Sequence, residues 1–404
     1  MDIVFVCESA VVSGGAEKIA IQEALELRKR GYRVGYIAGN NEADADLVAS
    51  GVEVLLLNTR SFFEETNRGL KIHKLLWNPE IEPEVEKFLK QFEPAQTIVH
   101  VLTFRLKLSG IVAHLAQKSG FPTVIHCLDY SPICPTSLYY DHRKQENCTR
   151  KPMSLSCITC ECQNQAWKYK VPKLTSHFWN QSVWRINQRA KGMLHLSQLE
   201  QDTIEAQFGW NSTGYPVLPI GENVPTDRVH AEDNQQFLFI GRLTEEKGLI
   251  PFLECAKEAG VPAVVIGDGP LMNQAREQFP EATFTGWIKI DKIIAELQKA
   301  RAVVVPSVWR ETLCLSVIDA MRMGVPCIVS ENVGAKQYIE DGVTGVRFED
   351  SHLLVAMDRF RDNELVKSMS ERAWQLFSDS PPSIELHVTE LLDIYAKCLE
   401  TSTK

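Results

Sequence analysis

The sequence predicts an α/β protein built from two doubly wound parallel sheets, each covered by helices on both faces. Short apolar runs alternate with amphipathic stretches through the first half, and the same rhythm resumes after a polar stretch in the middle of the chain. Continuous apolar runs bounded by helices are typical of parallel strands that are buried on both faces. A chain of 404 residues with 44% hydrophobic content can bury two cores of this kind.

The apolar runs place the expected strands and the domain boundaries. We expect a first domain at 1–223, a polar linker at 224–236, a second domain at 237–380, and a C-terminal helix at 381–404 that can cross back to the first domain. The expected strands are 3–7, 34–39, 52–57, 97–102, 123–128 and 192–197 in the first domain, and 237–242, 263–269, 302–307 and 326–331 in the second. Ligands of open α/β sheets bind beyond the carboxyl ends of the strands, so the residues after each run are the candidate site residues.

Composition narrows the function classes. A formal net charge of -9 argues against nucleic acid as the main partner, because duplex binding relies on clustered Lys and Arg. No uninterrupted apolar stretch reaches about 18 residues, and the N-terminal run contains Glu8 without a basic region ahead of it. Eleven cysteines without a secretory signal favour reduced thiols or metal ligands over disulfides. We therefore expect a cytoplasmic protein.

Residues 130–165 break the α/β rhythm and are expected to form an insertion in the first domain. Within it, Cys148, Cys157, Cys160 and Cys162 are four soft ligands in a short span, which is compatible with a structural Zn²⁺ ion. The alternative is a reduced, metal-free loop, because the spacing departs from paired C-x2-C knuckles. The next segment, 166–191, carries Lys, Arg and aromatic residues with no Asp or Glu. This composition is typical of a surface that contacts an anionic membrane.

Two glycines and two cations are candidate phosphate-binding residues. Gly14 and Gly15 follow the first strand and precede a helix, where free N–H groups attract phosphate or carboxylate, although such a pair is often only a turn. Arg242 ends a strand and Lys247 follows five residues later, so the two cations could hold a diphosphate. The alternative for Lys247 is a solvated side chain paired with a neighbouring glutamate.

Two carboxylates are candidate sugar-binding residues. Glu311 stands just before a helix and Asp319 lies eight residues later within it. Carboxylates can accept hydrogen bonds from sugar hydroxyls, but they are also common near helix N-termini as partners of the helix dipole.

The motifs of the second half resemble the nucleotide-binding domain of glycosyltransferase family 4, the bacterial-type group 1 glycosyltransferases. The matching pieces, in order, are G-R-L-x-x-x-K-G (241–248), G-x-G-P (267–270), F-x-G before Trp287, P-S-x-x-x-E-T (306–312), the E-x7-D pair, A-M-x-x-G-x-P (320–326) and G-x-x-G (342–345). The N-terminal Gly-Gly turn extends the resemblance to nearly all of the chain. It implies the GT-B fold, in which two Rossmann-like domains face a cleft, with the acceptor on the first and the nucleotide-sugar on the second.

The resemblance also implies a role for each matching residue. Arg242 and Lys247 would bind the donor diphosphate together with Gly14 and Gly15, Glu311 would contact the donor sugar, and Asp319 the ribose. The remaining nucleoside and sugar contacts would come from Gly267, Trp287, Thr312, Leu313, Cys314 and Leu315. The implied reaction is transfer of a sugar from a UDP- or GDP-sugar to a glycan or lipid-linked acceptor. It is usually retaining and needs no metal or other cofactor for catalysis.

Three positions depart from the family pattern. Asp319 stands where the family usually has Glu, and Cys314 where it usually has Gly. Many relatives read H-D-Y-W-P-I-C-P where residues 128–135 read L-D-Y-S-P-I-C-P, so Leu128 replaces the usual active-site histidine. His126 is the candidate replacement, with an imidazole that would face the interdomain cleft, and Asp129 is the competing catalytic candidate. The alternative for His126 is a core histidine.

Other functions compatible with these residues are a catalytically degenerate GT-B binding partner, a GT-B sugar-nucleotide epimerase and a phosphorylase. NAD-dependent chemistry is disfavoured, because Gly267 and Gly269 lack the third glycine of the dinucleotide fingerprint.

Overall fold

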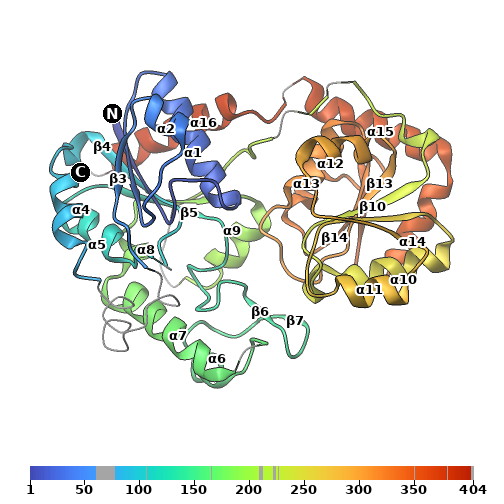
Figure 1. The fold of residues 1–404 in the computed structure, drawn as a ribbon, viewed down its shortest axis with the longest axis horizontal. Helices are drawn as coiled ribbons and strands as arrows, with labels where there is room; N and C mark the ends of the chain where they lie inside the picture. The colour runs from blue at the N-terminus through green and yellow to red at the C-terminus, as the bar shows by residue number, and fades with distance from the viewer. Residues whose placement is uncertain are drawn as a thin grey trace.

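The computed structural model of the chain contains two α/β domains side by side (Figure 1). It describes residues 1–60, 78–105, 107–164, 166–208, 213–221, 224–225, 227–349, 351–379 and 381–401. The expected domain boundaries at residues 223 and 380 and the last three residues of the expected C-terminal helix, 402–404, lie outside these ranges.

The first sheet has seven strands in the order β3-β2-β1-β4-β5-β8-β9, and every neighbouring pair is parallel. Strand β1 pairs with β2 on one side and β4 on the other, so the chain winds outward from β1 in both directions. The strands are β1 (Asp2–Cys7), β2 (Arg33–Ala38), β3 (Glu53–Leu56), β4 (Thr97–Val101), β5 (Thr123–Cys127), β8 (Gly192–His195) and β9 (Gly214–Pro216).

The second sheet has six parallel strands in the order β12-β11-β10-β13-β14-β15. The strands are β10 (Gln236–Ile240), β11 (Ala263–Ile266), β12 (Thr283–Gly286), β13 (Ala300–Val305), β14 (Cys327–Ser330) and β15 (Gly345–Phe348). The predicted α/β class with two doubly wound parallel sheets is therefore confirmed. The edge strands β9, β12 and β15 are not among the expected strands, because they are short and lack a long apolar run.

Helices cover both faces of each sheet and complete the cores. In the first domain they are α1 (Gly15–Lys29), α2 (Ala45–Ala49), α4 (Glu82–Leu89), η1 (Pro94–Gln96), α5 (Ile111–Lys118) and α9 (Gln198–Glu205). In the second they are η4 (Ala231–Asp233), η5 (Glu245–Lys247), α10 (Leu249–Ala259), α11 (Met272–Gln278), α12 (Ile290–Leu297), α13 (Leu315–Arg322), η6 (Gly334–Tyr338), α14 (Leu353–Asp358), η7 (Arg359–Arg361) and α15 (Asn363–Ser378).

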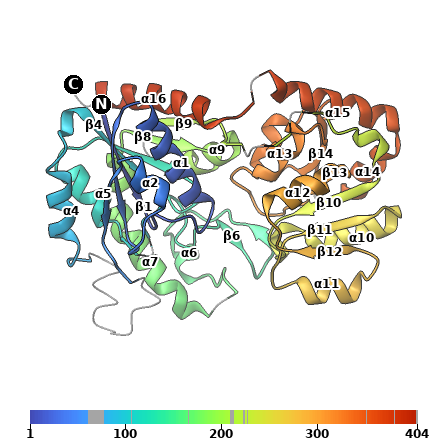
Figure 2. The ribbon, with the colours of Figure 1, turned by 45° about the horizontal axis from the view of Figure 1, so that its top comes forward.

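The segment that breaks the α/β rhythm lies below the first sheet and extends toward the second domain (Figures 1 and 2). It contains an antiparallel hairpin of β6 (Tyr140–Asp141) and β7 (Glu146–Asn147), followed by α6 (Leu155–Thr159). The basic and aromatic segment after it folds as η2 (Trp167–Tyr169), α7 (Lys170–Phe178), the π-helical turn η3 (Trp179–Val183) and α8 (Ile186–Arg189).

The last helix, α16 (Ile384–Glu400), returns from the second domain and lies along the first (Figure 2). Ser383 caps it by accepting a hydrogen bond from the amide of Leu386. Val388, Leu391 and Tyr395 recur at helical spacing on its buried face and pack into the core beside α1. None of the helices among the described residues is long and apolar enough to cross a membrane.

Candidate active site between the two domains

The loops that follow β10, β11 and β13 meet at the carboxyl edge of the second sheet. Two glycines allow their close approach. Gly267 has φ 139°, and a Cβ added there would lie 1.9 Å from the carbonyl oxygen of Gly241. Gly248 has φ 73°, and its Cβ would lie 2.2 Å from the carbonyl oxygen of Pro306. Only glycine fits both positions without displacing backbone. The absence of a side chain at these two positions therefore allows the loops that carry the G-R-L and P-S motifs to lie close together.

A buried ion pair joins two of these loops. Lys247 Nζ lies 2.8 Å from Glu311 Oε2, and the hydroxyl of Ser307 donates to Glu311 Oε1. The Glu311 backbone is fixed as well, since its amide donates to the Asn332 carbonyl and its own carbonyl accepts from the amide of Gly334. Glu311 is only 5% exposed, whereas the Lys247 side chain is 22% exposed. The structure therefore pairs Lys247 with Glu311 rather than with its sequence neighbours.

The Lys247 ammonium also lies 5.1 Å from the centre of the Trp309 ring. A cation in this position gains from the negative face of the indole ring and is held in place on two sides. Arg242 lies two residues beyond the end of β10 and is exposed. The two cations thus occupy one loop at the edge of the sheet, one of them fixed and one open to solvent.

Asp319 lies on α13 and is 8% exposed. Burial raises its pKa to about 6, and the charges of Arg322 and Lys18 oppose this shift. Lys18 belongs to the first turns of α1, directly after Gly14 and Gly15, which are exposed. The start of α1 therefore faces α13 across the domain boundary, within electrostatic range of Asp319.

Cys314 adopts φ 81° and ψ 82° at the start of α13. This left-handed region is costly for a residue with a Cβ, which gives a physical reason for the glycine that the family usually has here. Leu313 is buried behind it, and Leu315 is exposed. The Thr312 hydroxyl donates to the carbonyl of Leu128 at 3.5 Å, so this loop reaches the first domain.

Trp287 follows β12, the outermost strand of the second sheet on that side. Its side chain is 75% exposed. An exposed indole at the carboxyl edge of the sheet offers a flat apolar surface, but the structure does not bring it into contact with Lys247 or Glu311.

A residue of the insertion that sequence reasoning missed contacts the Glu311 loop. The side-chain amide of Asn147 donates to the carbonyl of Val308 at 2.8 Å, and its oxygen accepts from the amide of Arg310 at 3.0 Å. The Trp309 indole N–H in turn donates to the carbonyl of Leu138, also in the insertion. The β6–β7 hairpin of the first domain therefore braces the loop that carries Glu311. No periodicity or motif marks Asn147, since it is one polar residue in a polar loop.

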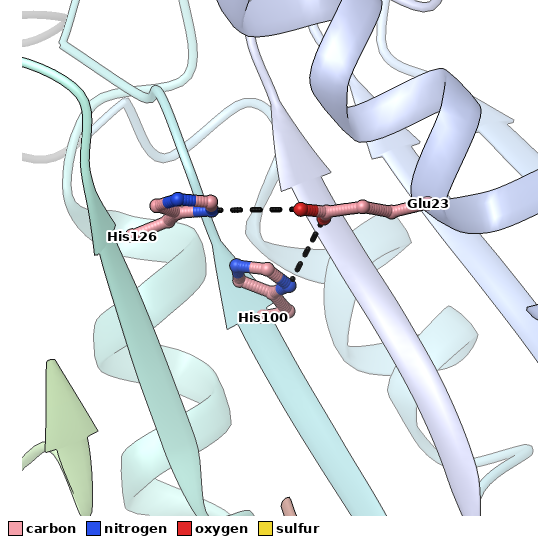
Figure 3. Close-up of side chains that lie close together, drawn as sticks. All are labelled: Glu23, His100 and His126. Atoms are coloured by element: carbon pink, nitrogen blue, oxygen red, sulfur yellow. Dashed lines mark ion pairs between the residues drawn. The ribbon is translucent and has the colours of Figure 1, made fainter. Parts of the chain in front are cut away.

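The structure contradicts the expected orientation of His126. Its side chain is buried under α1 and α16, where it lies near Glu23, His100 and His387 instead of facing the second domain (Figure 3). The physical reason is side-chain alternation, because Val124 and His126 share the sheet face that these two helices cover.

Asp129, the other catalytic candidate, stands just beyond β5 and is partly exposed. It accepts a hydrogen bond from the amide of Ser131 at 2.7 Å. The structure therefore places Asp129, rather than His126, on the accessible side of this strand end.

The four cysteines of the zinc prediction line one small cavity together with Cys134. Although burial opposes it, the Lys170 ammonium lowers the pKa of the Cys160 thiol, whose sulfur lies 3.0 Å from Lys170 Nζ. Among the described residues, no three cysteine sulfurs lie within 4.8 Å of one another. The geometry thus supplies a shared cavity but no assembled metal site, and zinc at these cysteines stays a prediction.

Comparison with known proteins agrees with this arrangement. Residues 234–360 match the family described as "Glycosyl transferases group 1". A GDP-mannose-dependent alpha-mannosyltransferase of Corynebacterium glutamicum is 29% identical over 171 residues, which are 41% of this chain and 40% of that protein. A second GDP-mannose-dependent alpha-mannosyltransferase, from Mycolicibacterium smegmatis, is 22% identical over 86% of this chain and 84% of its own length. The chain thus spans about two fifths of the first relative and most of the second.

The fold of a solved structure agrees over nearly the whole chain. The crystal structure of HepE of Anabaena in complex with UDP superposes with a TM-score of 0.62 at 13% identity, covering 98% of this chain and 100% of that one. The chain therefore has the GT-B fold. Its residues 234–360 match the group 1 glycosyltransferases, the family that the order and spacing of its motifs resemble.

Replacing Lys247 by Met should weaken binding of a nucleoside diphosphate by about 10- to 150-fold, because a charge-assisted contact to phosphate is worth about 1.5 to 3 kcal/mol. Arg242→Ala should have an effect of the same kind. Lys257→Met is the matched control, since Lys257 is an exposed lysine of α10 that pairs with Glu281. Calorimetric titration with UDP and GDP measures all three. Parental affinity in both Lys247→Met and Arg242→Ala would contradict the diphosphate assignment.

The raised pKa of Asp319 predicts a pH dependence of donor binding. The carboxyl group takes up a proton as the pH falls through about 6, and it then loses the charge that makes it a strong acceptor for ribose hydroxyls. The affinity for a nucleotide-sugar, whose phosphodiester groups do not titrate in this range, should therefore weaken over this interval. The Asp319→Asn variant should bind the nucleotide-sugar weakly at every pH, and its affinity should not fall further over this interval. If the affinity of Asp319→Asn still falls there, another group causes the pH dependence.

Asn147→Ala should lower kcat/KM for sugar transfer by about tenfold, because the loop that carries Glu311 loses two hydrogen bonds of about 0.5 to 1.5 kcal/mol each. Gln145→Ala is the control from the same hairpin, since Gln145 makes one exposed contact of 3.4 Å to Glu245. Steady-state kinetics on both variants compare the effects. Equal kinetics in the two would show that the hairpin does not support the donor site.

Proposed function

We propose that this protein transfers a sugar from a nucleotide-sugar to a glycan or lipid-linked acceptor, with retention of anomeric configuration and without a catalytic metal ion. The observation that supports the proposal is the ion pair of Lys247 with the buried Glu311 at the carboxyl edge of the second sheet. In this proposal, Lys247 stabilises the leaving diphosphate and the adjacent Glu311 carboxylate binds the sugar. Charge stabilisation from Lys247 and Arg242 can take the part that Mg²⁺ plays in metal-dependent transferases.

The carboxylate of Glu311 supports the sugar-binding role for a second reason. Ser307 and Lys247 each occupy one of its oxygens, and two backbone hydrogen bonds fix the residue. A carboxylate oriented in this way can accept hydrogen bonds from sugar hydroxyls without reorganising. Asp319, inside helix α13, is proposed to accept hydrogen bonds from the ribose, and Asp129 is proposed to position the acceptor.

Relatives suggest two classes of donor. The two mannosyltransferases are described as GDP-mannose-dependent, and the superposed structure contains UDP. We propose a UDP- or GDP-sugar as the donor. Relatives named for O-antigen chain and lipopolysaccharide synthesis make polysaccharide biosynthesis the proposed setting.

A catalytically degenerate binding protein is the second candidate function. Leu128 stands where the family usually has a histidine, and the side chain of His126 is buried in the core of the first domain. Cys314 adopts a left-handed conformation that suits glycine. Such a protein would bind a nucleotide-sugar without transferring the sugar. The two functions differ in turnover, not in donor affinity.

Glu311→Gln distinguishes them. The amide keeps the shape of the side chain but removes the charge beside the donor sugar, so transfer or donor hydrolysis should fall by about 100-fold or more while UDP or GDP affinity changes little. Glu296→Gln, on the exposed surface pair with Lys299, is the control. Release of nucleoside diphosphate from UDP-glucose and GDP-mannose provides the assay. A parent protein that binds a donor tightly yet releases no nucleoside diphosphate with any acceptor would favour the binding protein.

The face of residues 166–191 supports a proposed contact with anionic membrane at the inner side of the cell membrane. Trp167, Tyr169 and Phe178 are exposed there, and Lys168 lies over the Tyr169 ring at 5.2 Å. Aromatic side chains with adjacent cations bind the interface of a negatively charged bilayer, each cation contributing about 1 kcal/mol. Such a contact would bring the first domain to a lipid-linked acceptor.

Vesicle flotation tests this contact. The protein should float with vesicles that contain phosphatidylglycerol, float little with phosphatidylcholine alone, and be released by salt. The triple variant Trp167→Ala, Tyr169→Ala, Phe178→Ala should lose binding, whereas Leu376→Ala, an exposed leucine of the second domain, should not. Flotation that is independent of lipid charge would contradict the proposal.

A further inference from the structure

A carboxylate and several imidazoles gather in the core of the first domain, away from the donor site. Glu23 comes from α1, His100 from β4, His126 from β5 and His387 from α16, and all four are buried. Figure 3 shows the two strand histidines facing the Glu23 carboxylate. We call these four residues the carboxylate–histidine cluster.

The three residues drawn in Figure 3 have the spacing of metal ligands. His100 Nδ1 lies 3.5 Å from Glu23 Oε2, and His126 Nδ1 lies 3.7 Å from Glu23 Oε1. One ligand atom from each residue lies within 4.8 Å of the other two, a grouping that no other set of three His, Cys, Asp or Glu achieves among the described residues. One carboxylate and two imidazoles are a ligand set preferred by Zn²⁺ and related divalent ions.

Several buried polar atoms of the cluster lack a hydrogen-bond partner, which indicates that a further group binds between them. Glu23 Oε2, His100 Nε2 and both ring nitrogens of His126 have no hydrogen-bond partner among the described residues. A buried polar group without a partner costs about 1 to 3 kcal/mol. An ion between the facing nitrogen atoms and the carboxylate would use Glu23 Oε2 and His126 Nδ1.

The position of the two strand histidines suits an ion. Each ring turns its Nδ1 toward the Glu23 carboxylate, and a neutral imidazole offers the lone pair of such a nitrogen to a metal ion. The Tyr395 hydroxyl lies 2.6 Å from His100 Nδ1, so an ion bound to this nitrogen would replace the hydrogen bond and would have the hydroxyl beside it as a further oxygen donor.

His387 supports the cluster from α16. Its Nε2 lies 2.8 Å from Glu23 Oε1 and its Nδ1 lies 2.6 Å from the carbonyl oxygen of Leu218. Both partners are acceptors, so the ring carries both protons and orients the carboxylate as an outer-shell donor. Tyr395 and His387 both belong to the helix that returns from the second domain.

We propose that Glu23, His100 and His126 bind one divalent metal ion of the zinc class, which ties the C-terminal helix α16 to the core of the first domain. The site is structural, since it is enclosed by α1, α16 and the sheet. It is independent of the proposed sugar transfer and of the cysteine-lined cavity.

The experiment uses the full chain without a polyhistidine tag, in a background in which Cys134, Cys148, Cys157, Cys160 and Cys162 are all changed to Ser. Elemental analysis and Zn²⁺ titration against a competing chelator measure stoichiometry and affinity, and Co²⁺ substitution reports the ligands. We expect about one metal ion per chain, a melting temperature that rises with Zn²⁺, and a Co²⁺ spectrum without thiolate charge-transfer bands.

His126→Gln should weaken Zn²⁺ binding by about tenfold or more and remove the rise in melting temperature. His195→Gln is the matched control, because His195 is a buried histidine of the neighbouring strand β8 outside the cluster. If His126→Gln does not fold, Glu23→Gln serves instead. The proposal is overturned if the protein with these five serine substitutions binds no metal and does not respond to Zn²⁺, or if a folded His126→Gln or Glu23→Gln variant keeps the parental affinity.

Discussion

The proposed donor site depends on one ion pair, Lys247 with Glu311, which joins two loops at the carboxyl edge of the second sheet. The pair is possible because parallel strands end at a common edge and because Gly248 lets the Lys247 turn pack against Pro306. A carboxylate buried beside a lysine and a hydroxyl keeps its position, and a lysine held by that carboxylate and by the Trp309 ring does the same. Without the pair, the Glu311 carboxylate would be a buried charge with no cation beside it, and the Lys247 side chain would be mobile.

The first domain takes part in this arrangement, although most of the motifs assigned to the nucleotide-sugar lie in the second. The β6–β7 hairpin braces the Glu311 loop through Asn147, and the start of α1 brings Lys18 within electrostatic range of Asp319. Helix α16 adds a second connection by returning to the core of the first domain. The insertion therefore links the relative position of the two domains to the geometry of the proposed donor site, and the C-terminal helix holds the chain of the second domain to the first.

Much of this arrangement could be predicted from the sequence, because glycines at tight turns and charged residues after apolar runs are local signals. The two sheets, the Lys247 loop and the Glu311 loop follow from such signals. The location of His126 could not be predicted. Side-chain alternation along a strand shows which residues share a sheet face, but it does not show which helices cover that face. Asn147 was missed for a similar reason, since its partners lie more than 160 residues away and no spacing marks them. The metal-ligand spacing of Glu23, His100 and His126 likewise arises only when α1 packs on the sheet.

A crystal structure of the protein with UDP or GDP bound would test the central claim most directly. The diphosphate should contact Lys247 and Arg242, with Glu311 still held by Ser307 and directed toward the vacant sugar position. A nucleotide bound with its diphosphate away from both cations, or a Glu311 side chain released from its loop, would contradict the account.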